Sequence, residues 1–225
     1  MRIKKFAIAA AVLAGIAGQP LLAQDTDAQN SNGTTFRGVR VEGNIGADRF
    51  QSEGNHNDKL GYGGTVGFDG TIHDKIVIGA EGSFWRPGGG NENCTGLPDG
   101  NNICHKAFEE WGAAVRAGYL VNPDFLVFAK AGYVNREQRR RIDDASGSQL
   151  VYDHYRADGY QVGGGAEYTV THGALPVYVN AQYVYSNYHG HSSDQRLMTG
   201  IGIRFVRPPS NPFPVGADRL PRPGE

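Results

Sequence analysis

The sequence is poor in the features that define several common classes of protein. Of its 225 residues only two are cysteines and 39% are hydrophobic, and the mean hydropathy is −0.44. Neither sign of charge dominates: 22 basic residues stand against 23 acidic ones, which argues against a nucleic-acid partner held by released counterions. No apolar run after the N-terminus approaches the ~18 residues of a membrane-spanning helix.

Glycine and aromatic residues are abundant instead. The 33 glycines follow no Gly-X-Y period, which excludes collagen. The 11 tyrosines, 10 phenylalanines and 2 tryptophans are too many for a disordered chain. The length fits one domain.

The first 23 residues have the pattern of a secretory signal peptide. Arg2, Lys4 and Lys5 precede an alanine-rich apolar run, and we expect cleavage near Ala23. Export brings the chain into an oxidising compartment, where Cys94 and Cys104 are expected to form a disulfide that closes a short loop.

Between residues 39 and 205 apolar and polar residues alternate with a period of two, which predicts strands. Eight such segments are present: 39–45, 61–69, 76–84, 111–119, 125–133, 160–170, 177–185 and 197–205. The links between them alternate between three short turns and four long polar connections, the latter near 48–59, 86–106, 137–155 and 187–194. Sorting of loops by length is typical of an outer-membrane β-barrel.

The two faces of these strands differ in the way that a membrane requires. On the apolar face the aromatic residues gather at the strand ends, and mostly Val, Ile and Ala lie between them. One rim holds Tyr62, Phe84, Trp111, Tyr133, Tyr160 and Tyr185, and the other Phe68, Tyr119, Phe125, Tyr168 and Phe205. Two aromatic girdles around an aliphatic band match a bilayer. The predicted fold is all-β: an eight-stranded antiparallel up-and-down transmembrane β-barrel.

The opposite face carries charges that we expect to form a network in the lumen. It holds Arg40, Glu42, Asp69, Glu81, Arg116, Lys130, Glu167 and Arg204. Expected pairs are Glu81 with Arg116, Lys130 with Glu167, and Asp69 with Arg40, and closure of the barrel is expected to bring Arg204 towards Glu42 or Arg40. Eight strands leave a lumen that side chains can fill. A wide pore is therefore not expected, whereas a narrow or transient channel stays open as an alternative.

The pattern resembles the small OmpA-type and opacity-type outer-membrane proteins of Gram-negative bacteria, often called porin-like. The resemblance rests on residues 76–84 (IVIGAEGSF), 111–119 (WGAAVRAGY), 162–168 (VGGGAEY), 181–186 (AQYVYS) and 200–205 (GIGIRF). It implies a monomeric barrel inserted by the outer-membrane assembly machinery, with Phe205 as the terminal aromatic residue of the insertion signal.

The chain departs from this family by continuing past Phe205 with a proline-rich segment. The expected organisation is a signal peptide at 1–23, a polar segment at 24–35, the barrel at 36–206 and a periplasmic tail at 207–225. The tail is too short for the peptidoglycan-binding domain of longer OmpA-type proteins.

Two clusters in the long links are candidates for contacts outside the barrel. Arg136, Arg139, Arg140 and Arg141 could bind the phosphates of lipopolysaccharide in a bidentate manner, or form a solvated charged loop. His189 and His191, followed by Ser192, Ser193 and Asp194, suggest metal capture or hydrolysis of outer-leaflet lipid, but nothing in the sequence orients these side chains.

These observations favour a non-enzymatic protein without a cofactor or metal, acting in envelope integrity and surface contact. Its expected partners are outer-membrane lipid and lipopolysaccharide. A porin-like channel for small solutes and an outer-leaflet lipid hydrolase are the alternatives.

Overall fold

A computed structural model describes residues 35–52, 54–72, 75–89, 91–173, 175–189 and 192–205. Nine strands account for almost all of them: β1 (Gly38–Ser52), β2 (Asn55–Ile72), β3 (Ile76–Pro87), β4 (Asn91–Gly96), β5 (Asn102–Asn122), β6 (Phe125–Asp143), β7 (Gln149–Thr171), β8 (Val177–Tyr188) and β9 (Ser192–Phe205). No helix in this part of the chain is long and apolar enough to cross a membrane. The expected signal peptide and periplasmic tail lie outside the described residues.

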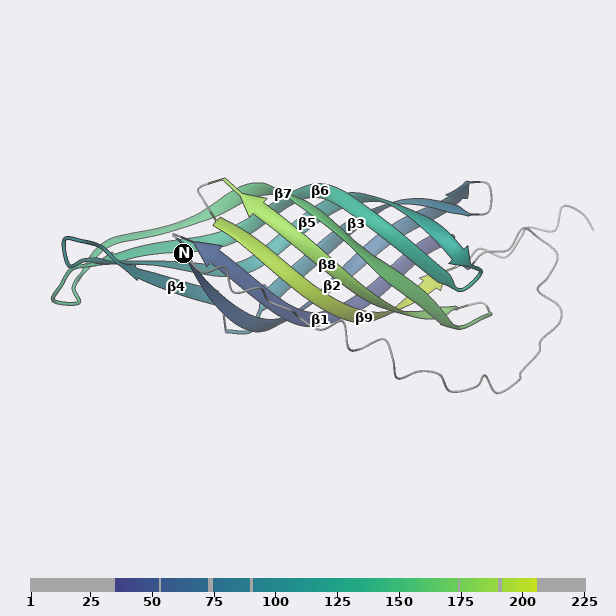
Figure 1. The fold of residues 1–225 in the computed structure, drawn as a ribbon, viewed down its shortest axis with the longest axis horizontal. Coiled ribbons are helices and arrows are strands. Elements are labelled where there is room, and N and C mark those ends of the chain that lie inside the picture. The colour runs from purple at the N-terminus through teal and green to yellow at the C-terminus, as the bar shows by residue number, and fades with distance from the viewer. Residues whose placement is uncertain are drawn as a thin grey trace, which may run out of the picture.

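Eight of these strands form a closed antiparallel ring (Figure 1). The sheet runs in the order β3-β2-β1-β9-β8-β7-β6-β5, and pairing between β3 and β5 closes it. The first and last strands are neighbours, with Val39 opposite Phe205. The predicted eight-stranded up-and-down barrel is thereby confirmed.

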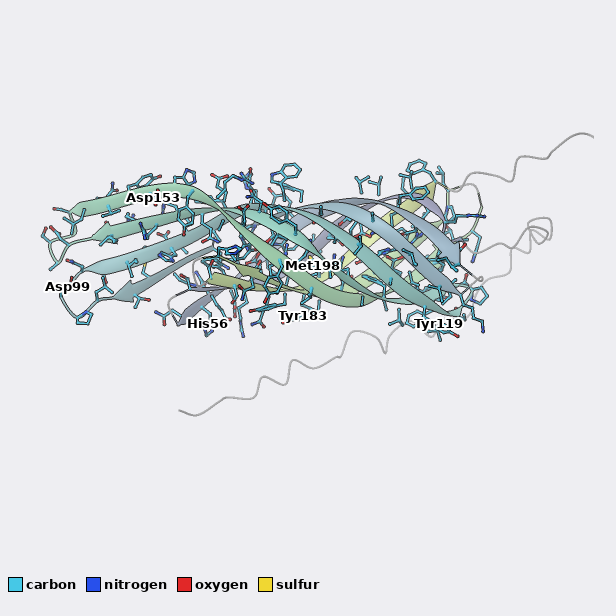
Figure 2. All side chains as sticks on the ribbon, turned by 90° about the horizontal axis from the view of Figure 1, so that it is seen from above. His56, Asp99, Tyr119, Asp153, Tyr183 and Met198 are labelled. Atoms are coloured by element: carbon cyan, nitrogen blue, oxygen red, sulfur yellow. A yellow bond between two sulfur atoms is a disulfide. The ribbon has the colours of Figure 1, made fainter. Side chains whose placement is uncertain are left out.

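The long polar links are the part of the prediction that is wrong. They are mostly strand rather than loop, because β5, β6 and β7 continue far past the barrel wall and a ninth strand, β4, pairs with the outer part of β5. We call residues 91–107 and 137–158 the extension. It projects from one end of the barrel in Figure 1, and Figure 2 places Asp99 and Asp153 within it, at the end opposite Tyr119.

The lipid-facing surface has the aromatic rims expected from the sequence. The side chains that are about half exposed include Tyr62, Trp111, Tyr133 and Tyr160 at the outer rim and Phe68, Tyr119, Tyr168 and Phe205 at the inner rim. Exposed Val, Ile and Leu side chains lie between the rims. This surface is apolar because lipid, not water, is its solvent.

Glycine occupies inward positions where neighbouring strands leave no space for a side chain. A Cβ on Gly200 would overlap Oδ1 of Asn44 and lie 2.6 Å from the carbonyl oxygen of Gly43. A Cβ on Gly43, which faces lipid, would meet nothing within 4 Å. Small inward residues therefore leave the lumen to the long charged side chains.

Candidate functional site in the barrel lumen

Eight ionisable side chains lie inside the barrel and are almost completely removed from solvent. We call them the central network: Arg40, Glu42, Asp69, Glu81, Arg116, Lys130, Glu167 and Arg204, none of them more than 7% exposed. Seven different strands supply them, each from the face opposite the exposed aromatic residues. Four are basic and four acidic, so the formal charges of the group balance.

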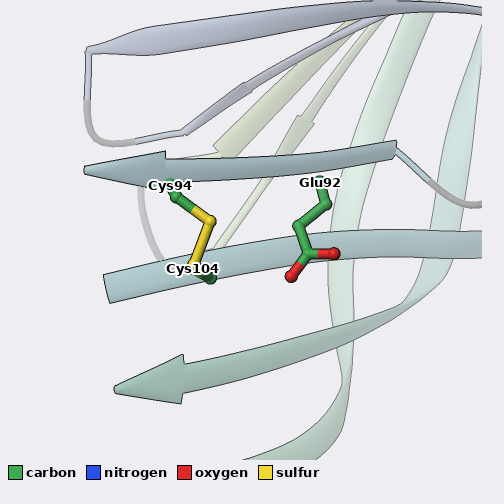
Figure 3. A group of neighbouring side chains, drawn as sticks. All are labelled: Glu92, Cys94 and Cys104. Atoms are coloured by element: carbon green, nitrogen blue, oxygen red, sulfur yellow. A yellow bond between two sulfur atoms is a disulfide. The ribbon is translucent and has the colours of Figure 1, made fainter. Parts of the chain in front are cut away.

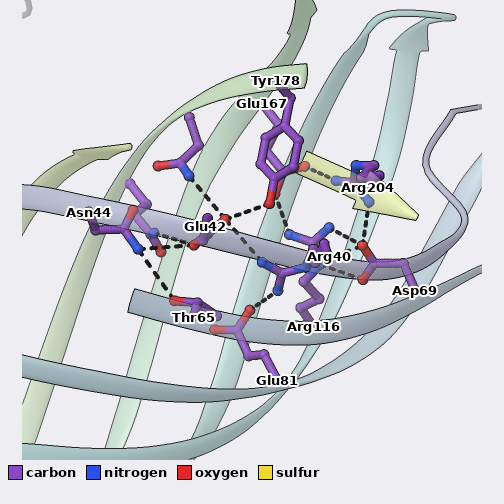
Figure 4. Close-up of polar contacts among 12 residues, drawn as sticks. Arg40, Glu42, Asn44, Thr65, Asp69, Glu81, Arg116, Glu167, Tyr178 and Arg204 are labelled. Atoms are coloured by element: carbon purple, nitrogen blue, oxygen red, sulfur yellow. Dashed lines mark hydrogen bonds and ion pairs between the residues drawn. The ribbon is translucent and has the colours of Figure 1, made fainter. Parts of the chain in front are cut away.

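Two arginines and two acids form a closed ring at one end of this network (Figure 4). Asp69 accepts hydrogen bonds from Nε and Nη2 of Arg116, at 2.8 and 2.6 Å, and from Nη1 of Arg204 at 2.6 Å. Glu167 contacts the same two guanidinium groups from the other side. Each arginine therefore lies between two carboxylates.

Arg40 connects this ring to the remaining acids. Its Nε is 3.3 Å from Asp69, its Nη1 donates to Glu42 at 3.1 Å, and its Nη2 contacts Glu81. Nζ of Lys130 donates to Glu81 at 2.8 Å. All eight charges thus belong to one connected set.

Neutral groups complete the shell of Glu42. Its carboxylate accepts hydrogen bonds from the Tyr178 hydroxyl at 2.9 Å and from the side-chain amides of Asn180 at 3.1 Å and Asn44 at 3.2 Å. A buried carboxylate without such donors would cost several kcal/mol. The side chains around Glu42 therefore offset the loss of its hydration.

The register explains why two of the expected pairings, Glu81 with Arg116 and Lys130 with Glu167, are wrong. Arg116 lies directly opposite Lys130 across β5 and β6, and Arg40 lies directly opposite Arg204 across β1 and β9. These cations contact acids from other strands: Arg40 and Arg204 share one oxygen of Asp69, and Lys130 contacts Glu81. Among the described residues, Arg116 therefore binds Asp69 and Glu167 rather than Glu81, Lys130 binds Glu81, and Arg204 binds Asp69 and Glu167. The contact of Arg40 with Asp69 is as expected, and closure brings Arg204 beside Arg40, also as expected.

A second buried network lies closer to the extension and was missed by the sequence analysis. We call it the outer network: Asp48, Glu110, Arg136, Asp194 and Arg196, each at most 3% exposed. Arg136 contacts Asp194 and places Nη2 3.2 Å from Asp48. Arg196 donates to Glu110 at 2.6 Å, with its Nε 3.4 Å from Asp194.

Three acids face two arginines in the outer network, and neutral donors bind two of the acids, Asp48 and Glu110. Nε1 of Trp85 donates to Asp48 at 2.7 Å, Nδ2 of Asn91 donates to the same carboxylate at 3.1 Å, and the Tyr188 hydroxyl donates to Glu110. Most of the network lies in segments that were assigned to loops. Continuing the two-residue alternation from Glu42 through Asn44 to Asp48 is the signal that could have found it.

Apolar layers fill the space around the two networks. Trp85, Val184 and Met198 form a cluster beside a cavity of about 20 Å³, which Lys130 and Arg196 also line. A cavity of this size holds about one water molecule. A second cluster comprises Phe36, Val77, Leu120, Leu126 and Phe128, and the Arg204 guanidinium lies 4.8 Å from the Phe36 ring. Side chains thus fill the lumen in layers.

A closed ring with polar residues inside and aromatic rims outside agrees with the comparison to known families. Residues 8–205 match the model of the outer membrane protein beta-barrel domain. The chain belongs to this family. It is therefore an outer-membrane protein. No curated protein matches the sequence.

Solved structures of small outer-membrane barrels are similar to this family member. Ail, the attachment invasion locus protein of Yersinia pestis, crystallised with the heparin analogue sucrose octasulfate, has 15% identity and a TM-score of 0.48, covering 75% of this chain and 99% of its own. Neisserial surface protein A has 14% identity and a TM-score of 0.48, with 74% and 97% covered. The N-terminal barrel of Pseudomonas aeruginosa OprF has 12% identity and a TM-score of 0.41, with 72% and 96% covered.

The two cysteines of this outer-membrane barrel lie in the extension as a cross-strand pair. Cys94 on β4 is opposite Cys104 on β5, and a disulfide joins them (Figure 3). Glu92 lies close by, so the three side chains cluster as metal ligands do. Cysteine binds a metal ion as the thiolate, and the sulfur atoms of a disulfide are not thiolates. The cluster is therefore a cross-link rather than a metal centre.

The four arginines proposed to bind lipopolysaccharide do not lie together. The prediction of a lipid contact is wrong for Arg136. Its side chain is fully buried in the outer network, because β6 continues through this segment and turns alternate residues inward. Arg139 and Arg141 lie on the outward face, where Arg139 donates to Glu92 at 3.1 Å and Nε of Arg141 is 3.0 Å from Asp143. Arg140 lies on the opposite face, with Nη2 3.6 Å from Asp153.

The side chains after His189 do not converge in the described part of the chain. Asp194 is in contact with Arg136 inside the barrel, the Ser192 hydroxyl is 3.1 Å from Nε2 of Gln138, and Nδ1 of His189 is 2.9 Å from the carbonyl oxygen of Asp158. His191 lies outside the described residues. Phe205, the expected insertion signal, is the last described residue and is 46% exposed on the lipid-facing side.

Proposed function

We propose that this protein is a closed, non-enzymatic barrel that contributes to envelope integrity and presents its extension for contact outside the cell. The observation that carries the proposal is the layered lumen, in which the Phe36 cluster, the central network and the outer network follow one another along the barrel. An ion that crosses it must separate several buried charge pairs. Removing one partner of such a pair costs about 3–5 kcal/mol, so conduction through the resting barrel should be negligible.

Planar bilayer recordings test the closed lumen. The mature chain, without residues 1–23, is expected to show no stable conductance steps. Two variants test the layers separately, because R136A disrupts the outer network and R204A disrupts the central network. The double variant should conduct more than either single variant. Stable steps in the nanosiemens range from the unmodified chain would establish the porin-like alternative.

The non-enzymatic part of the proposal is supported by the separation of Ser192, His189 and Asp194. Incubating the purified barrel with lipid A should release no acyl chain. Any release that the S192A variant lacks would establish a hydrolase. Envelope integrity is measured in a strain that lacks the protein, which should become more sensitive to detergent and recover when the chain is restored.

Contact with lipopolysaccharide is proposed for the outward face of the extension, beyond the outer aromatic rim. Arg139 and Arg141 lie on this face and Arg140 does not, so the three residues supply their own control. Co-purified lipopolysaccharide should fall in R139Q/R141Q and remain unchanged in R140Q. Equal retention in both variants would refute the contact.

Assembly is proposed to follow the route implied for the family, with Phe205 as part of the signal for the insertion machinery. F205A should reduce the amount of folded barrel in the outer membrane, and F205Y should not. The proposal fails if F205A assembles as well as the unmodified chain.

A further inference from the structure

One edge of the extension is left unpaired. Gln149 and residues 151–158 of β7 pair with β6 on one side, with an irregularity at Leu150, but β8 joins β7 only from Gly159, which lies opposite Tyr188. Figure 1 shows β7 continuing past β8 into the extension. Ten residues of strand therefore stand outside the barrel with a single neighbour in the described chain.

The direction of the unpaired backbone groups follows from one hydrogen bond. The carbonyl oxygen of Asp158 accepts from the backbone N–H of His189 at 2.9 Å, so the main chain of Asp158 points towards the β8 side. Backbone groups of a strand alternate in direction. Arg156, His154 and Tyr152 therefore direct N–H and C=O to the open side, while Tyr155 and Asp153 direct theirs to β6.

This edge carries apolar side chains that lipid does not explain. Leu150, Val151 and Tyr152 are 58%, 38% and 54% exposed. Tyr160 marks the outer aromatic rim, and Tyr152 lies eight residues further along β7, about 26 Å at the rise of a strand. An open edge with exposed apolar side chains is a template for another strand.

The other edge of the extension is covered. Nδ2 of Asn57 donates to the carbonyl oxygen of Glu92 at 2.9 Å, and Nδ2 of Asn55 donates to the Thr95 hydroxyl at 2.7 Å, so the tip of β2 shields β4. The Cys94–Cys104 disulfide fastens β4 to β5. The extension is thus a fixed sheet whose β7 edge is open.

We propose that the open edge of β7 pairs with the same edge of a second copy, in an antiparallel register centred on His154. Antiparallel edges require the two barrels to point in opposite directions, so the copies lie in opposed membranes and each barrel stays single within its own. This names the partner for the surface contact of the proposed function and rests on that part of it, not on the closed lumen.

The sequence of the edge is self-complementary in this register. Tyr152 lies opposite the partner's Arg156, Asp153 opposite the partner's Tyr155, and Leu150 opposite the partner's Asp158. An aromatic ring thus faces a guanidinium group twice, a favourable contact. The two copies of His154 face each other in this register, and no other pair could bring like charges together. Each His154 lies 2.7 Å from Glu137 of its own chain, which would compensate a positive charge on the ring.

Sedimentation of the mature chain in detergent tests the pairing. We expect a dimer that forms as concentration rises. H154P removes a backbone N–H from the open side without removing one from the β6 ladder, and should weaken the dimer about tenfold or more. H154T keeps the N–H and should dimerise as before. A chain that stays monomeric, or a dimer that survives H154P, overturns the proposal.

Cysteine cross-linking tests the register. Y152C and R156C should cross-link on oxidation only when the two variants are mixed, because each residue lies opposite the other and about 13 Å from its own copy. Vesicles carrying the protein should cluster, and H154P vesicles should not. Cross-linking of Y152C alone overturns the register. If the dimer does not form and the barrel does not conduct, the pairing is refuted and the proposal of a closed lumen still stands.

Discussion

Arg116 offers a direct measurement of what the central network contributes to stability. Its guanidinium group binds Asp69 through Nε and Nη2, at 2.8 and 2.6 Å, and also contacts Glu167. In R116M the apolar stem is roughly kept and the charge is lost, which leaves Glu167 with Arg204 alone and Asp69 with Arg204 and Arg40. Removing one partner from a buried pair costs about 3–5 kcal/mol because the remaining charge is uncompensated. We expect R116M to lower the free energy of unfolding by this amount.

Arg49 supplies a control with the same geometry and different burial. Its Nε and Nη2 bind the two carboxylate oxygens of Asp58, both at 2.7 Å, but the side chains are 23% and 53% exposed. An exposed pair contributes only about 0.2–1 kcal/mol. R49M should therefore destabilise the barrel far less than R116M, although both variants lose a bidentate pair.

Reversible unfolding by guanidinium in phospholipid vesicles measures both variants, with the fluorescence of Trp85 and Trp111 as the signal. A further variant separates lost charge balance from lost packing: R116M/E167Q removes one acid with the arginine and should regain part of the loss. If R116M and R49M cost the same, or if the double variant is as unstable as the sum of both changes, the network is not what stabilises the lumen.

Three further predictions concern the wall and the extension. G200A should destabilise the barrel by about 1–3 kcal/mol because its Cβ would overlap Asn44, whereas G43A should stay within about 0.5 kcal/mol, both read from the same unfolding assay. C94S/C104S should speed proteolysis in the turn at 97–101 and leave the unfolding of the barrel unchanged. The disulfide closes a short loop, which restricts the unfolded chain by roughly 3 kcal/mol, and it acts on the extension alone. Hydrogen bonds from Ser146 and Ser148 lower the pKa of the Asp144 carboxyl below 3.8 in the folded protein. The ionised carboxylate therefore stabilises the turn above pH 3.8, and this stabilisation is lost as the pH falls through the pKa of the folded state. The amide chemical shifts of Ser146 should follow this titration, and D144N should abolish it.

The sequence predicts the barrel well because lipid imposes a strict rule on it. Every second residue of a spanning strand must face either lipid or lumen, so the period of two places Glu81 and Tyr133 on opposite faces without knowledge of the fold. It predicts the partners of these charges poorly. Arginine side chains reach across the lumen, and which acid they meet depends on strand stagger, which alternation does not encode.

Outside the membrane the rule fails for a physical reason. Polar residues of the extension have water on both faces, so their composition reads as loop although β6 continues as strand to Asp143. An irregularity between Ala107 and Glu110 also changes which residues of β5 face inward. Ala107 is buried above it, and Glu110 is buried below it. The polar composition around Arg136 therefore indicates a loop, although continuing the alternation of β6 from Lys130 places its side chain in the lumen.

The register of the charges also determines when the central network can form. Arg40 lies opposite Arg204 across β1 and β9, the pair of strands that joins the ends of the barrel, and these two cations repel unless acids lie between them. Asp69, on β2, contacts both arginines, and Glu167, on β7, contacts Arg204. Because Asp69 and Arg204 lie on opposite sides of this junction, their contact forms only when β1 and β9 have joined and closed the ring. Closure and charge pairing therefore depend on each other, and the barrel should fold and unfold in one cooperative step rather than hairpin by hairpin.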